Sequence, residues 1–245
     1  MGKYKVIDGN EACAHISYMF TEIAGIYPIT PASPMSEYID KWSTEGRLNL
    51  FNNKVKLIEM QSEAGAIALV HGSLQTGSLA STYTASQGLL LMIPSMYKIA
   101  GEMLPCVINV ASRTVATHAL SIFGDHSDIY ASRSTGFCFL ASSSVEDTIY
   151  MTLASYLSTL KGKLPFVNFF DGFRTSHELN KVYVPDMSEI KGLVPFKTID
   201  NFRKESMISK KQIKGTTQND DVYFQNLEAR NKYYDKMPDV VNECM

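Results

Sequence analysis

The feature that most constrains the fold of this chain is the alternation of short β-rich runs with helical patterns between residues 1 and 180. The run "KVKLIEM" precedes the helical stretch "SEAGAIALVHGSLQTG", and the same succession continues through "SLASTYTA", "LPCVINVAS" and "LPFVNFFD". Strands separated by helices at this spacing form βαβ units. We therefore expect an α/β fold that is doubly wound, with a mainly parallel sheet and helices on both of its faces.

Two of the predicted helices carry specific expectations about proline. In "SPMSEYIDKW" we expect Ser33 to cap the helix and Pro34 to take the first helical position, where the missing N–H is tolerated. In "SQGLLLMIPSMYKIAGEM" we expect Pro94 and Gly101 to kink or split the helix, because proline removes an internal hydrogen bond.

The character of the sequence changes near residue 180. Beyond that point the chain is more charged, carries three prolines and loses the alternation of strands and helices. We expect a single α/β domain over residues 1–245, with a βα core (1–180) and an irregular extension (181–245) that packs on the core or on other domains. A chain of 245 residues is long enough to bury a sizeable core.

Composition and charge exclude several classes of protein. The net charge of -2 predicts no attraction to nucleic acid or to anionic membranes, and the longest apolar run, "GLLLMIP", is too short to span a bilayer. The start, "MGKYKVIDGNEACAH", lacks the apolar segment of a signal peptide. The isolated cysteines predict no zinc site, no iron–sulfur cluster and no disulfide framework: Cys13, Cys106, Cys138 and Cys244. We expect a soluble protein of the cytoplasm or of a reducing organelle.

Three polar residues follow predicted strands and are candidates for a ligand site. Thr30 follows "GIYPI", Glu63 follows "KVKLIEM" and Arg113 follows "LPCVINVAS". Ligands of such sheets bind at the carboxyl ends of the strands, and a guanidinium can hold a carboxylate with two hydrogen bonds. An arginine that only faces solvent at a strand end fits the spacing of Arg113 equally well.

A serine hydrolase is a rival interpretation. "TASQG" at 84–88 lies between a strand and a helix and differs by one residue from G-x-S-x-G, while Asp171 and His177 follow Ser86 in the order of a triad. Thr84 in place of the first glycine suits such a turn badly, and the six positions from Asp171 to His177 are too few for two strand-end loops. Helix capping by Ser86 is the simpler interpretation.

Two other motifs predict little. "GDHSD" at 124–128 could place Asp125, His126 and Asp128 on a metal, but three polar residues in a turn more often hydrogen-bond to the local backbone. "GSLQTGS" lacks the lysine of a phosphate-binding loop. We expect no metal site in this chain.

Long blocks of the sequence nevertheless resemble one family. They are similar, in order, to the N-terminal domain of pyruvate:ferredoxin (flavodoxin) oxidoreductase, a thiamine-diphosphate-dependent 2-oxoacid oxidoreductase. The similarity runs from "DGNEACAH" to "NKYYDKMP", which is almost the whole chain. The blocks are "IYPITP" (26–31), "EMQSEAGA" (59–66), "TASQGLLLMIPSMYKIAGEMLP" (84–105), "HALSIFGDHSDIYA" (118–131) and "FFDGFRTSHE" (169–178).

The resemblance implies a pyrimidine-binding domain with defined site residues. Glu63 would contact N1′ of the cofactor's aminopyrimidine, and Thr30 and Arg113 would hold pyruvate. A carboxyl group that shares a proton with N1′ favours the imino form, which removes the proton from the thiazolium C2. The start of a helix favours the anion of Glu63 by about 0.3–1 kcal/mol, while burial beside small residues opposes it. "GDHSD" matches a family segment without an assigned role.

The resemblance also implies partners and cofactors that this chain does not hold by itself. The family oxidises pyruvate with coenzyme A to acetyl-CoA and CO₂ in anaerobic metabolism and passes electrons to ferredoxin or flavodoxin. The sequence lacks the G-D-G motif for diphosphate and Mg²⁺, the cysteine-rich segments for iron–sulfur clusters and the coenzyme A domain. We expect a homodimer in the complete enzyme and no activity of this chain alone. A non-catalytic module that docks through residues 181–245 is the alternative.

Overall fold

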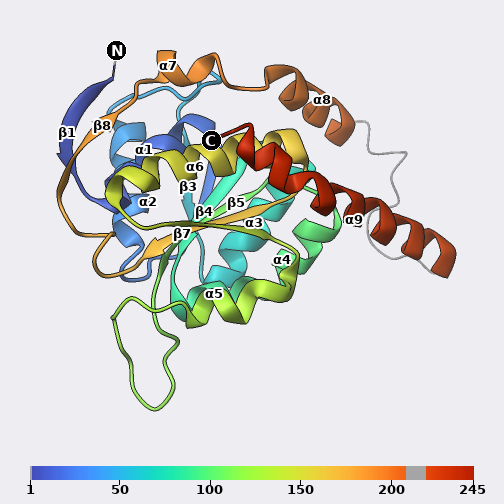
Figure 1. Ribbon diagram of the computed structural model, residues 1–245, viewed down its shortest axis with the longest axis horizontal. Coiled ribbons are helices and arrows are strands. Elements are labelled where there is room, and N and C mark those ends of the chain that lie inside the picture. The colour runs from blue at the N-terminus through green and yellow to red at the C-terminus, as the bar shows by residue number, and fades with distance from the viewer. Residues whose placement is uncertain (1, 208–218) are drawn as a thin grey trace.

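The computed structural model describes residues 2–207 and 219–245, and its centre is a parallel sheet of six strands in the order β3-β2-β4-β5-β7-β6 (Figure 1). Every neighbouring pair in this sheet is parallel. The predicted α/β fold with a parallel sheet is therefore confirmed. The strands are β2 (Ile23–Ile26), β3 (Lys56–Glu59), β4 (Ala80–Thr84), β5 (Val107–Ser112), β6 (Cys138–Ser142) and β7 (Phe166–Asp171).

Helices cover both faces of this sheet. One face carries α1 (Gly9–Phe20), α2 (Ser33–Thr44) and α6 (Val145–Gly162), which share the buried clusters that contain Phe20 and Tyr18. The other face carries α3 (Glu63–Gln75), α4 (Ser86–Gly101) and the short α5 (Ser127–Ser132), which is followed by a 3-10 turn at Arg133–Thr135. Figure 1 shows these two groups above and below the strands.

Burial explains why the central strands were readable from the sequence. All residues of β4 and β5 are buried, as expected for strands covered on both faces, which read as continuous runs rather than alternating patterns. Side chains at the helix starts fix the junctions: Asp8 caps α1, Ser62 caps α3 and Ser144 caps α6, each by accepting a backbone N–H of the first turn.

The structure corrects the expectation about α2 and part of the one about α4. Ala32 is the residue that precedes α2, so Ser33 is the first helical residue and makes no capping bond, and Pro34 lies one position further in. Pro94 does not split α4, which is continuous from Ser86 to Gly101 with Met92 and Met96 buried against the core, and the kink stays a prediction.

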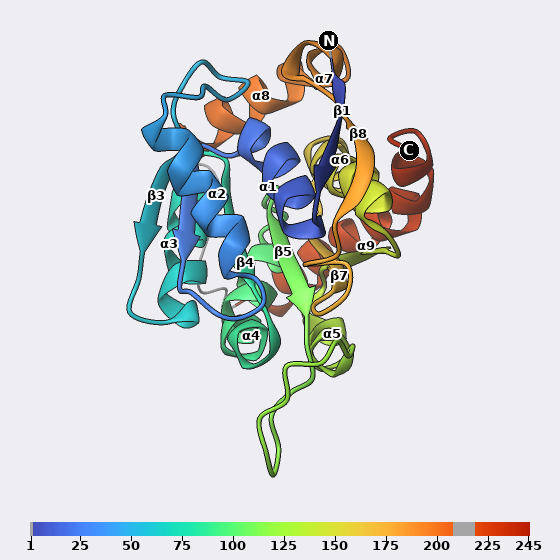
Figure 2. The ribbon, with the colours of Figure 1, turned by 90° about the vertical axis from the view of Figure 1, so that its left-hand side faces the viewer.

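A small antiparallel sheet was not predicted. It pairs β1 (Lys3–Ile7) with β8 (Asn180–Val184), so that Tyr4 lies opposite Tyr183 and the two rings meet edge to face at 5.6 Å. In Figure 2 this ribbon runs beside α1 and α6, apart from the main sheet. Its inner residues Val182 and Val184 join the hydrophobic core.

In the part that the structure describes, residues 181–207 and 219–245 are mostly helical or strand, which corrects the expectation of an irregular extension there. Besides β8 it contains α7 (Met187–Lys191), α8 (Phe196–Met207) and α9 (Asp220–Asn242). The last helix lies against α6, where Met237 packs so closely on Gly162 that a Cβ there would lie 2.4 Å from the Met237 Cε. The proposed division into a core of 1–180 and an extension of 181–245 stays a prediction.

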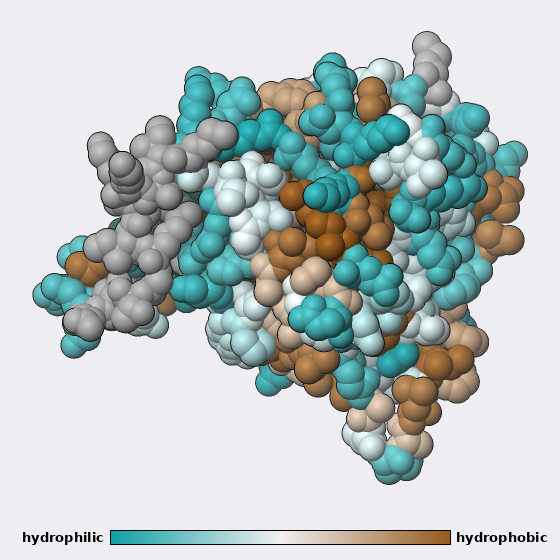
Figure 3. Space-filling view, turned by 180° about the vertical axis from the view of Figure 1, so that it is seen from behind, coloured by the Kyte–Doolittle hydropathy of each residue, from teal (hydrophilic) through white to brown (hydrophobic). Residues whose placement is uncertain are grey.

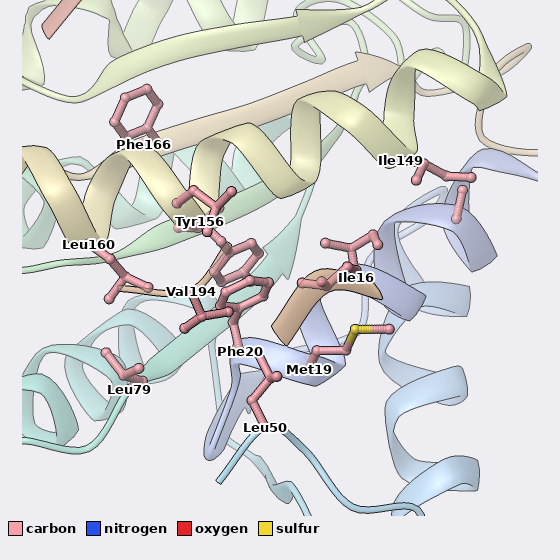
Figure 4. Close-up of a cluster of buried hydrophobic side chains, with 14 of the residues drawn as sticks. Ile16, Met19, Phe20, Leu50, Leu79, Ile149, Tyr156, Leu160, Phe166 and Val194 are labelled. Atoms are coloured by element: carbon pink, nitrogen blue, oxygen red, sulfur yellow. The ribbon is translucent and has the colours of Figure 1, made fainter. Parts of the chain in front are cut away.

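One cluster of apolar side chains ties these parts together (Figure 4). The rings of Phe20 in α1 and Tyr156 in α6 stack with centroids 5.1 Å apart and an interplanar angle of 14°. Val194, from the connection before α8, packs into the same cluster. Stacked aromatic pairs contribute about 0.5–1.5 kcal/mol beyond the area that they bury. None of the helices in the described ranges is long and apolar enough to cross a membrane.

Candidate functional site

The candidate residues lie at one edge of the main sheet, where four neighbouring strands end. Thr30 is in the turn after β2, Glu63 begins α3 directly after β3, Ser86 begins α4 after β4, and Arg113 follows β5. Because these strands are adjacent and parallel, their carboxyl ends meet at the same edge. The sequence-predicted residues are therefore on the side of the sheet where α/β proteins bind ligands.

Arg113 and Thr30 are in direct contact. The Nη1 of Arg113 donates a hydrogen bond of 2.6 Å to the carbonyl oxygen of Thr30, so the backbone of Thr30 and not its hydroxyl makes this contact. The arginine is only 6% exposed, and burial lowers its pKa while the nearby Asp128 opposes that change. Its Nε is buried and has no partner within the described residues. The guanidinium therefore keeps donors that a ligand could use.

The turn that carries Thr30 is held from α1. Asn10 is fully buried, and its Nδ2 donates a hydrogen bond of 3.1 Å to the carbonyl oxygen of Pro31. The backbone N–H groups of Ala32 and Ser33 close the same turn on the carbonyl of Ile29. The turn thus has a fixed shape while the side chain of Thr30 remains exposed.

Glu63 is buried, as its apolar surroundings in the sequence suggested, with 6% of its surface exposed. Its side chain reaches from α3 to the first turn of α4. A Cβ on Gly88 would lie 2.9 Å from the Glu63 Oε1 and 2.4 Å from the Oγ1 of Thr84. Only glycine fits there without movement. The neighbouring Thr84 Oγ1 is buried and has no hydrogen-bond partner among residues 2–207 and 219–245.

Asp128 was named from the sequence only as a conceivable metal ligand, and its hydrogen bonds to the segments that carry the candidate site were not predicted. It is completely buried, and its two carboxylate oxygens accept four hydrogen bonds. The Oδ2 accepts from the backbone N–H of Ser86 at 2.8 Å and of Arg113 at 3.1 Å. The Oδ1 accepts from the Ser112 hydroxyl at 2.6 Å and the Ile129 N–H at 2.8 Å. Burial raises the pKa of Asp128, and these hydrogen bonds oppose the increase.

Asp128 belongs to the segment "GDHSD", and the first two polar residues of that segment, Asp125 and His126, interact with neighbouring groups. Asp125 is exposed, and hydrogen bonds from the Ser127 side chain first, and then from the Ser127 N–H to its Oδ1 at 2.6 Å, lower its pKa. His126 meets the ring of Phe169 edge-on at 5.3 Å. The part of the chain that the structure describes contains no group of three or more histidine, cysteine or acidic side chains that could hold a metal ion.

The hydrolase interpretation is not supported by the geometry. Ser86 has a φ of 50°, as at a nucleophile elbow, but its Oγ donates to the carbonyl of Thr114 at 2.7 Å and to the Gln87 Oε1 at 2.5 Å. His177 is bonded to the neighbouring Ser176, and the Oδ1 of Asp171 accepts backbone N–H groups of its own loop. Ser86 is also not the helix cap, because Ala85 precedes α4 and the Ser86 N–H is bonded to Asp128.

A loop beyond β5 projects from this edge of the molecule. The loop exposes the apolar side chains of Leu120, Ile122 and Phe123. In Figure 3 it projects at the lower right, where brown apolar atoms gather. Phe123 packs on Phe173 with ring centroids 5.2 Å apart. An open hollow beside this loop is lined by Gly124, Asp125, His126, Ser127, Tyr130 and Asp171.

Comparison with known proteins agrees with the resemblance inferred from the sequence. The family described as pyruvate flavodoxin/ferredoxin oxidoreductase, thiamine diphosphate-binding, matches residues 16–245. The chain is 52% identical over 245 residues to the pyruvate-flavodoxin oxidoreductase of Klebsiella pneumoniae, and 52% identical over 242 residues to the pyruvate:ferredoxin oxidoreductase of Moorella thermoacetica. These alignments cover 100% and 98% of this chain but only 21% of each relative.

A solved structure supports the fold at lower similarity. The 2-oxoglutarate:ferredoxin oxidoreductase of Magnetococcus marinus superposes with a TM-score of 0.66, at 21% sequence identity. The superposition covers 76% of this chain and 32% of that one. The likeness confirms the architecture of the sheet and its helices.

Proposed function

This chain belongs to the thiamine diphosphate-binding family of pyruvate flavodoxin/ferredoxin oxidoreductases, and from this membership we propose that it supplies the pyrimidine side of a thiamine diphosphate site and the groups that hold pyruvate. The complete enzyme would oxidise pyruvate with coenzyme A to acetyl-CoA and CO₂ and reduce ferredoxin or flavodoxin. Mg²⁺ and iron–sulfur clusters would be held by parts of that enzyme other than this chain. It would act as a homodimer in the cytoplasm or in a reducing organelle.

The observation that carries the proposal is the set of unpaired polar groups at the strand ends. Among the described residues, the Thr84 Oγ1 and the Arg113 Nε are buried without partners, and the Glu63 carboxylate lies beside Thr84 at Gly88. Buried polar groups without partners are uncommon in folded proteins and call for an explanation such as an absent ligand. A flat pyrimidine edge and a small carboxylate are ligands that match these groups in chemistry.

Glu63 is proposed to hold the pyrimidine through one proton. Its carboxyl oxygen would share that proton with N1′, which keeps the ring in the form needed for reaction. When bound, thiamine diphosphate supplies the electron sink that makes decarboxylation of a 2-oxoacid possible. Gly88 leaves the space in which the Glu63 side chain lies, and Ser62 fixes the start of α3 so that the carboxyl group points toward α4.

Arg113 is proposed to hold the carboxylate of pyruvate. Its guanidinium is positioned by the Thr30 carbonyl, and its remaining N–H donors can bind both oxygens of a carboxylate. Burial strengthens such a charge-assisted hydrogen bond because little water competes for it. The exposed hydroxyl of Thr30 would add one hydrogen bond to the same substrate.

The test uses a hybrid enzyme, in which this chain replaces the aligned 245 residues of the Klebsiella pneumoniae relative. We expect the hybrid enzyme to reduce flavodoxin with pyruvate. Glu63→Gln keeps the shape of the side chain but removes its acidic proton, so turnover should fall by about 10²–10⁴-fold, the usual range for an acid–base group. The matched control is Glu59→Gln, an exposed glutamate at the end of β3.

A second readout separates the chemistry from folding. Exchange of the thiazolium C2 proton into deuterium oxide, measured by NMR after acid quench, should slow in Glu63→Gln and not in Glu59→Gln, while the melting temperature changes little. Equal exchange rates in Glu63→Gln and the unsubstituted hybrid enzyme would refute the role of Glu63. A folded hybrid enzyme with neither exchange nor turnover would instead favour a non-catalytic docking module.

A further inference from the structure

We infer that Asp128 is a positioning residue that sets the placement of Arg113 and Glu63 relative to each other, an inference that rests on the proposed function. Asp128 itself is sealed from the site, with 0% of its surface exposed. It acts through backbone groups of the segments that carry the site residues.

The carboxylate of Asp128 replaces hydrogen bonds that the sheet cannot supply. The pairing of β4 with β5 ends at Thr84 opposite Val110, after which β4 turns into α4 while β5 continues beside β7. The N–H groups of Ser86 and Arg113 lie just past this point and have no partner in a strand. Both are bonded instead to the Oδ2 of Asp128, at 2.8 and 3.1 Å. A single oxygen atom therefore bridges the ends of two neighbouring strands.

Each of these two hydrogen bonds fixes the backbone near one site residue, Arg113 in one case and, through α4, Glu63 in the other. The bond to the Arg113 N–H fixes the backbone from which the guanidinium reaches the carbonyl of Thr30. The bond to the Ser86 N–H holds that residue at a φ of 50°, a left-handed conformation that a serine rarely adopts. This conformation sets the direction of the first turn of α4, and Gly88 in that turn packs against Glu63.

The other carboxylate oxygen anchors Asp128 itself. The Oδ1 accepts from the Ser112 hydroxyl, and the same hydroxyl is 2.5 Å from the carbonyl oxygen of Asp125. The Oδ2 thus faces two N–H donors, and the Oδ1 faces the Ile129 N–H and a hydroxyl that can donate or accept. An asparagine would have to direct its NH₂ group at two N–H donors in one orientation, or at the Ile129 N–H in the other. A glutamate would add a methylene group where no surface is exposed.

The first experiment measures the geometry on this chain itself and does not depend on any activity. Amide hydrogen exchange of Ser86 and Arg113 should be slow in the unsubstituted chain and at least tenfold faster in Asp128→Asn. Asp125→Asn is the matched control, because Asp125 is exposed in the same loop and an asparagine Oδ1 can still accept the Ser127 N–H. Unchanged protection of both amides in Asp128→Asn would overturn the inference.

The second experiment measures the consequence in the hybrid enzyme. Displacement of reacting groups by about 1 Å can cost on the order of 100-fold in rate, so Asp128→Asn should raise the KM for pyruvate and slow C2 proton exchange, by at least tenfold each. A residue that only stabilised the fold would lower the melting temperature and the yield of active enzyme, but would leave both values unchanged per folded molecule. That outcome would refute the positioning role.

A milder variant covers the case in which Asp128→Asn does not fold. Ser112→Ala removes one donor to Asp128 and leaves both bridging N–H bonds possible, so the KM for pyruvate should rise by a few-fold only. No change in KM or in C2 proton exchange would count against the inference. If the unsubstituted hybrid enzyme shows no pyruvate-dependent reduction, the proposed function fails; if it is active and the variants match it, only the role of Asp128 fails.

Discussion

Histidine 15 should make the stability of this chain depend on pH. Its Nε2 donates to the carbonyl of Pro185 at 2.8 Å, and its Nδ1 accepts from the Arg47 Nη2 at 3.2 Å. The Arg47 guanidinium lies over the rings of Tyr18 and Trp42, at 4.8 and 4.5 Å from their centroids. The neutral histidine thus joins α1 to the segment after α2 and to the turn after β8. A protonated ring would have to give up the bond from Arg47.

The pKa of His15 sets the size of the effect. Burial first, and then the charge of Arg47, lower the pKa from 6.5 to about 4; Lys5 acts in the same direction, while Asp186 and the bond to Pro185 oppose it. The unfolded chain therefore binds a proton near pH 6.5, whereas the folded chain stays neutral until about pH 4. The contribution of His15 to the free energy of unfolding is fully present above pH 6.5 and is lost as the pH falls toward 4. Linkage between proton binding and folding gives a decrease of about 2 kcal/mol in the free energy of unfolding between pH 7.5 and 5. Because an open hollow beside His15 admits solvent, we expect a decrease of about 1–2 kcal/mol.

The assay is urea unfolding of the unsubstituted chain and of His15→Gln at pH 7.5, 6 and 5. Glutamine keeps a donor for Pro185 and does not titrate, so the variant should be less stable at pH 7.5, and the difference between the two chains should shrink by about 1–2 kcal/mol at pH 5. His118→Gln, at an exposed position bonded only to Thr117, is the control. A stability difference for His15→Gln that is the same at all three pH values would refute the reasoning.

Two further predictions concern the strand-end groups in the hybrid enzyme. Gly88→Ala places a Cβ 2.9 Å from the Glu63 Oε1 and should slow C2 proton exchange. The control is Gly72→Ala in α3, where nothing lies within 4 Å of the added Cβ; it should leave the exchange rate unchanged and stabilise the chain by up to about 1 kcal/mol. Equal exchange rates in both variants would contradict the placement of Glu63. Arg113→Ala should lower kcat/KM for pyruvate by the equivalent of about 2–5 kcal/mol in transition-state stabilisation. Arg113→Lys should restore only part of it, because lysine lacks the planar guanidinium fork. Unchanged kinetics in Arg113→Ala would make the arginine purely structural.

The main sheet was predictable because its central strands are buried on both faces. Such strands read as short, nearly continuous runs, and the helices between them supply the repeat that fixes parallel pairing. β1 and β8 gave no comparable signal, since they lie outside the repeat of strands and helices and pair residues far apart in the sequence, such as Lys3 with Val184. The helix α9 was missed for another reason: Met237 is its one buried residue, and the partly buried Tyr234 and Val241 that continue its apolar face stand among many charged residues.

The candidate site was predictable only in part. Thr30, Glu63 and Arg113 were found because each follows a strand, and strand ends converge in a parallel sheet. Asp128 could not be found in that way, since it enters the site from the start of α5, 15 residues beyond Arg113. Ser86 was misread because "TASQG" does not reveal that the serine N–H is taken by a distant carboxylate. Hydrogen bonds of this kind depend on tertiary geometry that local patterns do not encode.

Two sets of buried polar groups in this chain contrast in a way that bears on where a ligand binds. Between α1, α6 and the sheet, the side chains of Cys13, Asn109, Asn168 and Tyr156 are hydrogen-bonded to one another, with Asn168 donating to Asn109 at 3.1 Å. Such a network stabilises the packing of the two helices and is fully enclosed by them, although one of its atoms, the Asn168 Oδ1, has no partner in the described chain. At the strand ends, by contrast, the Arg113 Nε and the Thr84 Oγ1 are buried without partners in the described chain.

An unpaired buried donor or acceptor destabilises a fold by about 1–3 kcal/mol. That penalty falls on a site that Asp128, Asn10 and Gly88 hold in a fixed shape, so the groups cannot relieve it by turning toward one another. A ligand that brings an acceptor to Arg113 and a proton-sharing nitrogen to Glu63 would gain the hydrogen bonds that the protein alone leaves unmade. We therefore expect a ligand to bind at this edge, where unpaired groups are held in a fixed shape beside the exposed Thr30.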